Sequence, residues 1–230
     1  IATIGVGGGS GTLNLNDTEL GKLTDGFSSI TIGDAANTGA VDVDSSTFTD
    51  PVTIIGDSIV VTELAAGANA VNLTAIGAGG ITDGGMGETD VTGTAVTLTA
   101  NAGPIGSGGN YLELAATSLT SSTTGGGGQF LDEADTVSVT SVASGGANLD
   151  ILGGEFDLNN NAIANTTPII VRNGATLDAN GATDTLALIT IASGGTVTGS
   201  GTLTAKVSGD PGSMITTGGN LGLGDGTASG

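Results

Sequence analysis

The sequence predicts an all-β protein, a right-handed parallel β-helix (β-solenoid) folded as a single elongated domain. Short apolar segments recur about every seven residues through the middle of the chain, and apolar and polar residues alternate within them, as in strands with one buried face. Gly, Ser, Asn or Asp follows nearly every segment, which indicates tight corners. Of the 230 residues, 44 are Gly and only 2% are aromatic, so the composition favours a narrow core of stacked small layers.

The first 24 residues are expected to form an N-terminal strand followed by a capping and assembly segment. Residues 1–6 alternate like a strand and lead into a glycine-rich stretch. Residues 16–23 then predict a single helical turn, in which Asp17 or Thr18 is the N-cap and Leu20 and Leu23 share a face.

Residues 25–215 are expected to form the parallel β-helix, and residues 216–230 a Gly-rich C-terminal segment. Three short strands and their corners make a unit of roughly twenty residues, which predicts roughly ten to eleven coils. At about 4.8 Å per coil the rod would be on the order of 50 Å long. The strand prediction rests on these segments: Ile30–Ile32, Val41–Val43, Val52–Ile54, Ile59–Val61, Val71–Leu73, Val137–Val139, Leu149–Ile151 and Phe156–Leu158.

Two internal echoes support a repeat. The Asn-Gly-Ala-Thr sequence at residues 173–176 recurs immediately downstream at residues 180–183. The motif at residues 91–100, Val-Thr-Gly-Thr followed by Thr-Leu-Thr-Ala, has a close counterpart at residues 197–205. Both echoes fit corners that recur at the spacing of one strand plus one turn.

Composition and charge exclude several classes of function. The chain carries 23 acidic and 3 basic residues, a formal net charge of −20, so it has no basic cluster for nucleic acid or for an anionic membrane. It has no Cys and no His, which removes thiol chemistry, zinc fingers and imidazole catalysis. No stretch approaches the roughly 18 consecutive apolar residues of a membrane span, so no transmembrane helix is predicted.

Five segments carry a resemblance to known proteins: residues 13–20, 30–39, 96–106, 112–119 and 197–205. The first four resemble very large secreted bacterial proteins of the filamentous haemagglutinin type, and the last resembles autotransporter passenger repeats. The resemblance implies a right-handed parallel β-helix, an extracellular location at the cell surface, and a non-catalytic role in adhesion or matrix. The chain lacks the large size and the secretion domain of that family, and it starts at Ile rather than Met, so we expect a processed chain or a segment of a longer one.

An enzyme that acts on polysaccharides is the alternative function, because lyases and glycoside hydrolases also use β-helix scaffolds. A lyase would need Arg172 or Lys206 as its base, and the acidic surface would repel a polyanionic substrate. A hydrolase would need paired carboxylates. The candidate pairs, Asp42 with Asp44 and Glu155 with Asp157, each flank an apolar residue, which indicates two acids on the solvent face of a strand. The sequence therefore favours a protein that is not an enzyme.

Calcium is the metal that the acidic residues favour, and no other cofactor is expected. Asp132, Glu133 and Asp135 lie in a predicted corner, and clustered carboxylates suit a hard cation. Residues 84–90, Gly-Gly-Met-Gly-Glu-Thr-Asp, are similar to the glycine–aspartate loops that bind calcium but are not tandemly repeated. The alternative for both segments is a solvated acidic loop.

The surface and the ends of the rod predict modification and assembly. Asn16, Asn72 and Asn165 begin Asn-x-Ser/Thr sequences and are glycosylation candidates. Terminal coils leave backbone groups unpaired, so we expect end-to-end association with further copies of the chain, or caps from flanking repeats of a longer chain. Surface carbohydrate or another cell is the further expected partner. The assembly candidates are Ile1, Ile4, Val6, Leu221 and Leu223.

Overall fold

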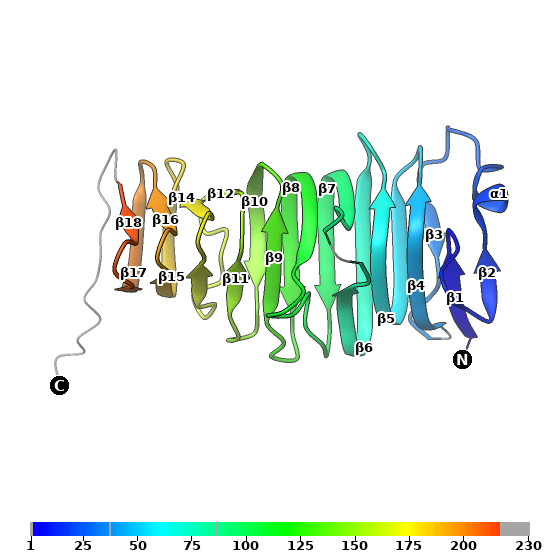
Figure 1. Ribbon diagram of the computed structural model, residues 1–230, viewed down its shortest axis with the longest axis horizontal. Helices are drawn as coiled ribbons and strands as arrows, with labels where there is room; N and C mark the ends of the chain where they lie inside the picture. The colour runs from blue at the N-terminus through cyan, green and yellow to red at the C-terminus, as the bar shows by residue number, and fades with distance from the viewer. Residues whose placement is uncertain (1, 37, 86, 217–230) are drawn as a thin grey trace.

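The computed structural model describes residues 2–36, 38–85 and 87–216. It is a single elongated all-β domain, a parallel β-solenoid of about nine turns in which about 2% of residues are helical. The strands stand side by side along the long axis, with β1 and β2 at one end and β17 and β18 at the other (Figure 1). The predicted fold class is therefore confirmed.

The described elements are eighteen strands and one short helix. In chain order they are β1 (Ala2–Val6), β2 (Leu13–Leu15), α1 (Asp17–Leu20), β3 (Ile30–Ile32), β4 (Thr38–Thr47), β5 (Val52–Ala65), β6 (Ala70–Asp83), β7 (Val91–Ala100), β8 (Leu112–Thr123), β9 (Gln129–Glu133), β10 (Thr136–Ala143), β11 (Leu149–Ile151), β12 (Glu155–Leu158), β13 (Ile169–Val171), β14 (Thr176–Asp178), β15 (Thr183–Ile191), β16 (Thr196–Thr198), β17 (Thr202–Gly209) and β18 (Met214–Ile215).

Residues 129–209, which we call the regular coils, repeat with nearly constant length. Leu149 pairs with Ile169, and Ile169 pairs with Ile189, so these residues occupy the same position in successive coils. The strand pairings in this region are parallel and advance by roughly twenty residues per coil. This matches the coil length that the sequence predicts.

Residues 71–119, which we call the expanded coils, are longer. Val71 pairs with Val96, and Val96 pairs with Leu119, so both turns exceed the length of a regular coil. The extra residues lie between strands rather than within them. Val61 and Leu64 are close together in β5, but their partners Asp83 and Val91 are separated by a longer segment, so residues are inserted there.

The core is a continuous aliphatic column inside the coils. Side chains alternate inward and outward along each strand, and the inward residues of β5, such as Val52, Ile54 and Ile59, are fully buried. Phe156 is the largest fully buried side chain of the described residues, and the next largest are those of Leu and Ile residues. Burial at about 25 cal/mol per Å² of apolar surface, together with the parallel backbone ladder, stabilises the rod.

Two details of the predicted coils were wrong. The structure has about nine turns rather than ten to eleven, because the expanded coils are longer than predicted and residues 16–29 form α1 and a loop. In addition, predicted separate strands merge: Val52–Ile54 and Ile59–Val61 belong to β5. The strand turns this corner with a register shift between Gly56 and Ser58 instead of a break.

The predicted corners of the regular coils are confirmed. Gly174 and Gly181 both adopt positive φ angles, 91° and 79°. Each is followed by a buried alanine whose backbone N–H closes the turn: Ala175 donates to Arg172 O at 3.1 Å and Ala182 to Ala179 O at 2.7 Å. The echoed Asn-Gly-Ala-Thr sequence thus forms a corner at both places, although Asn180 has a positive φ of 47° and Asn173 does not.

The helical turn is also confirmed, with a different cap. The N-cap of α1 is Asn16 rather than Asp17 or Thr18. Its side chain accepts from the backbone N–H groups of Thr18 and Glu19, and the Glu19 carboxylate accepts from the Asn16 N–H, which completes a capping box. Leu20 is buried, whereas the Leu23 side chain is exposed.

The N-terminal strand lies inside the sheet. β1 pairs with β2 on one side and with β4 on the other, so Ile4 and Val6 are core residues, and β2 is the strand beyond it (Figure 1). The glycine run makes this order feasible because a Cβ on Gly9 would lie 2.0 Å from the Asp42 carbonyl oxygen.

Candidate functional site

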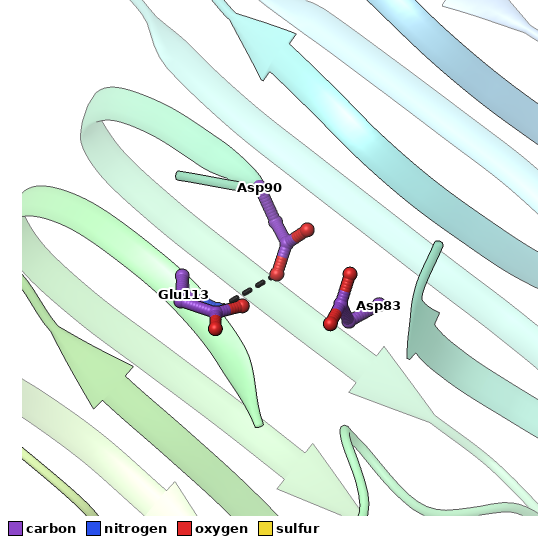
Figure 2. A group of neighbouring side chains, drawn as sticks. All are labelled: Asp83, Asp90 and Glu113. Atoms are coloured by element: carbon purple, nitrogen blue, oxygen red, sulfur yellow. Dashed lines mark hydrogen bonds between the residues drawn. The ribbon is translucent and has the colours of Figure 1, made fainter. Parts of the chain in front are cut away.

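Three carboxylates from different parts of the expanded coils meet in one place (Figure 2). Asp83 ends β6, Asp90 precedes β7, and Glu113 is the second residue of β8. One carboxylate oxygen from each lies within 4.8 Å of the other two. Asp83 and Asp90 are 8% and 1% exposed, and Glu113 is half-buried. We call these three residues the acidic cluster.

The insertion in the expanded coils builds the cluster. Asp83 and Asp90 flank the inserted residues, and their carboxylates turn back toward the solenoid (Figure 2). Asp83 Oδ1 accepts from the Gly85 N–H at 2.6 Å, and Asp90 Oδ2 accepts from the Glu113 N–H at 2.8 Å. The second bond fixes the inserted segment to the following coil.

Two oxygens of the cluster have no hydrogen-bond donor. Asp83 Oδ2 and Glu113 Oε2 are both buried and unpartnered. A buried carboxylate oxygen that accepts no hydrogen bond has lost its hydration without a replacing interaction, and this destabilises the folded state. Two such atoms beside a third acid indicate that this cluster holds something that neutralises it.

Electrostatics point the same way. Burial, followed by the neighbouring Glu113 carboxyl, raises the pKa of Asp90 to about 10. Burial also raises the pKa of Glu113. If all three were ionised, each pair would repel by about 3 kcal/mol at an effective dielectric constant of about 20. The cluster therefore requires a proton or a cation.

No basic side chain neutralises the cluster. Of the residues that the structure describes, Arg172 is ion-paired with Asp150 rather than with the cluster. Lys22 and Lys206, the other two basic residues, are exposed near opposite ends of the solenoid.

A surface cavity of about 280 Å³ lies beside the cluster. Glu113 belongs to both, and the cavity is also lined by two further acids, Glu88 and Asp132. The cavity gives small solutes a route to Glu113, and its acidic lining favours cations. Gly87, Thr89, Leu114 and Ala134 complete the lining.

A second group of acids lies on the regular coils. Glu155 and Asp157 of β12 and Asp178 of β14 bring carboxylate oxygens within 4.8 Å of one another. Burial raises the pKa of Glu155 and of Asp157. All three side chains are half-buried, so this group is more open to water than the acidic cluster. Asp178 belongs to this group because it is the ladder partner of Asp157, which lies in the preceding coil.

The structure does not bring the predicted calcium residues together as a set. Asp132 and Glu133 are successive residues of β9, so they face opposite sides of the strand. Glu133 points inward, is 2% exposed and accepts from the Ala116 N–H at 3.1 Å, whereas Asp135 is exposed. Asp132 lies outward at the cavity.

The predicted catalytic candidates are engaged in structural contacts or exposed. Arg172 donates two hydrogen bonds to the buried Asp150 carboxylate, at 2.8 and 2.6 Å, which raises the pKa of the guanidinium. Asp42 accepts from the Ser10 N–H at 2.7 Å and holds the glycine run in place, while Asp44 is exposed.

The glycosylation candidates differ in accessibility. The Asn16 side chain is the cap of α1. Asn72 is half-buried in β6, and its Nδ2 lies 3.4 Å from Thr53 Oγ1. Asn165 lies in an exposed turn, although Thr167 of the same sequence is buried. Asn16 and Asn165 are thus both exposed, whereas Asn72 is half-buried.

The assembly candidates divide into two groups. Ile4 and Val6 are buried in β1, as described above. Ile1, Leu221 and Leu223 lie outside the described residues.

Sequence reasoning identified part of the acidic cluster. The segment that ends at Asp90 was noted as similar to calcium-binding loops, with a solvated acidic loop as the alternative, and Asp83 and Glu113 were missed. The signal for Glu113 is the coil period, because Glu113 follows Asp90 by one expanded turn, the same interval that separates Val91 from its partner Leu114.

Comparison of the chain with family models, with curated proteins and with solved structures found no match. The resemblance to filamentous haemagglutinin-type and autotransporter repeats therefore stays a prediction. In the part of the chain that the structure describes, no helix is long and apolar enough to cross a membrane.

Proposed function

We propose that this chain is a non-catalytic structural protein of the bacterial cell surface, a β-helical fibre subunit or adhesin stalk. The observation that carries this proposal is the continuous, mainly aliphatic core inside about nine parallel turns. Each coil contacts mainly its neighbours, so the fold builds length and stiffness rather than an enclosed reaction chamber.

An extracellular setting is supported by the residues that face outward. A formal charge of −20 with three basic residues keeps such rods apart and soluble, and a chain without Cys needs no particular redox environment. The family resemblance of residues 13–39 and 96–119 leads to the same proposal.

End-to-end association is the finer part of the proposal, with further copies of the chain or with flanking repeats. Large apolar side chains are exposed in the end strands: Leu13 of β2 is 52% exposed, and Met214 and Ile215 of β18 are 54% and 40% exposed. β2 and β18 are strands of a parallel ladder, so a neighbouring coil could extend it by backbone pairing and cover these side chains.

Sedimentation velocity and negative-stain electron microscopy test this assembly. We expect concentration-dependent rods longer than one chain, and we expect Leu13→Asp and Ile215→Asp to shorten them. Leu152→Asp is the matched control, because Leu152 is 38% exposed but lies in the middle of the rod. A strictly monomeric wild type, or equal loss of rods in the control, would contradict end-to-end assembly.

A polysaccharide-active enzyme is the second candidate because Glu155 and Asp157 are close together with raised pKa values. The ion pair of Arg172 with Asp150 weighs against a lyase, since a guanidinium held in this way is a poor base. Reducing-end release from acidic and neutral polysaccharides separates the candidates. Release that Glu155→Gln abolishes would favour the enzyme and overturn the structural proposal.

A further inference from the structure

The acidic cluster has the features of a ligand site that lacks its ligand. Asp83 is more than nine-tenths buried, its Oδ2 has no donor, and its carboxylate is directed toward Asp90 and Glu113 (Figure 2). Buried polar atoms are normally hydrogen-bonded, so two unpartnered carboxylate oxygens, Asp83 Oδ2 and Glu113 Oε2, beside a third acid call for a ligand. A bound group that accepts electron pairs from all three would satisfy them together.

We propose that Asp83, Asp90 and Glu113 bind one calcium ion at the base of the insertion in the expanded coils. This site is distinct from the predicted set Asp132, Glu133 and Asp135, and it does not depend on the structural role proposed above.

The geometry and chemistry of the donors select the ion. Three carboxylates offer only oxygen, and the chain contains no imidazole or thiolate, so a hard cation fits better than zinc or copper. Two oxygens bound to one Ca²⁺ at about 2.4 Å lie at most about 4.8 Å apart, and the three carboxylate oxygens here all lie within that limit. Calcium also tolerates irregular coordination completed by water, whereas Mg²⁺ demands a near-octahedral shell.

The surroundings give the ion access. Glu113 is half-buried and borders the adjacent cavity, which connects the cluster to solvent. Glu88 and Asp132 line that cavity and attract cations toward it.

A bound ion would join two segments that are separate in sequence. Asp83 and Asp90 flank the insertion, and Glu113 belongs to β8 of the next coil. Calcium at this point would close the base of the inserted segment and tie it to the following coil. The ion would therefore stabilise the part of the rod whose coils are least regular.

Isothermal titration calorimetry with CaCl₂ on the chelator-treated full chain tests the proposal. We expect one calcium ion per chain, and at least a tenfold weaker affinity in Asp83→Asn and in Glu113→Gln. Asp57→Asn and Glu63→Gln are the matched controls, because each removes one carboxylate from an exposed residue outside both acidic groups, and we expect them to bind like the wild type.

Thermal unfolding of the wild type in millimolar CaCl₂ and in chelator gives a second measurement that needs no variant. We expect a higher melting temperature in calcium, since an ion that binds only the folded state stabilises it. Absence of binding together with identical melting curves would overturn the proposal and leave the cluster holding protons. Binding that the control variants remove, while Asp83→Asn keeps it, would also overturn it.

Discussion

The regular coils and the expanded coils share one core but differ in the segments that connect their strands. In the regular coils most residues of each turn form short strands and corners, and the coil length stays near twenty residues. In the expanded coils, the longer turns keep the same inward aliphatic side chains but carry extra segments outside the ladder. The acidic cluster and the adjacent cavity lie at those segments.

This difference bears on where a binding site can form on the rod. A ladder position fixes a side chain's direction, so a strand residue points either into the lumen or outward. Asp83 is the last paired residue of β6 and Asp90 directly precedes β7, and the insertion between them lets their carboxylates meet (Figure 2). Departures from the coil period are therefore the places to look for sites on such a rod.

The largest expected loss of stability comes from substitutions in the core, and these test whether the core is continuous along the rod. Leu98 of the expanded coils and Leu149 of the regular coils are both fully buried. We expect Leu98→Ala and Leu149→Ala each to lower the free energy of unfolding by about 2–5 kcal/mol, because each leaves a cavity in a packed column. Urea denaturation measures both. A cost below about 1 kcal/mol in one of them would mean that the core is not continuous.

A second substitution tests how closely Gly80 of β6 packs against the segment between β7 and β8. Gly80 has φ of +70°, and a Cβ there would lie 2.1 Å from the Pro104 carbonyl oxygen. Gly80→Ala should lower the free energy of unfolding by about 2–4 kcal/mol through backbone strain and this clash. Gly109→Ala is the control, since a Cβ on Gly109 meets nothing within 4 Å. Equal stability of the two variants in urea would contradict the close packing at Gly80.

The pH dependence of stability should be concentrated in buried acids such as Glu133. Burial raises its pKa from 4.5 to about 7, so the folded state holds the proton more tightly than the unfolded state. Its contribution is then fully present below about pH 4.5 and is lost as pH rises through about 7. Between about pH 5 and 8 this loss amounts to about 2–3 kcal/mol.

Urea denaturation in chelator across this pH range measures the Glu133 effect. Glu133→Gln, which resembles the protonated acid, should remove that part of the slope. Glu63→Gln alters an exposed glutamate and should keep the wild-type slope. A Glu133→Gln variant that loses stability with pH as steeply as the wild type would show that another group is responsible.

The regular coils were largely predictable from the sequence because their determinants are local. Alternating apolar residues place β11 at Leu149–Ile151 as expected, and the repeated Asn-Gly pairs mark corners at residues 173–174 and 180–181. Each such feature depends on a few neighbouring residues of the chain, so a pattern read along the sequence finds it.

The site was less predictable because it depends on coil length. Asp83 and Glu113 are far apart in the sequence, and they meet only because the insertion changes which residues of adjacent coils align. The position of β1 between β2 and β4 was missed for a related reason. This position requires the glycine run after β1 to pass close to the backbone of β4, and the alternation of apolar residues does not reveal that contact.

The central claim is that the expanded coils bind the ligand while the regular coils serve as the rod. Backbone amide hydrogen exchange with and without calcium, resolved by residue, tests it most directly. The Gly85 and Glu113 N–H groups donate to Asp83 and Asp90. We predict that calcium slows exchange of these two amides at least tenfold and leaves the amides of β11 and β13 unchanged. No change at Gly85 and Glu113, or equal slowing along the whole rod, would contradict the claim.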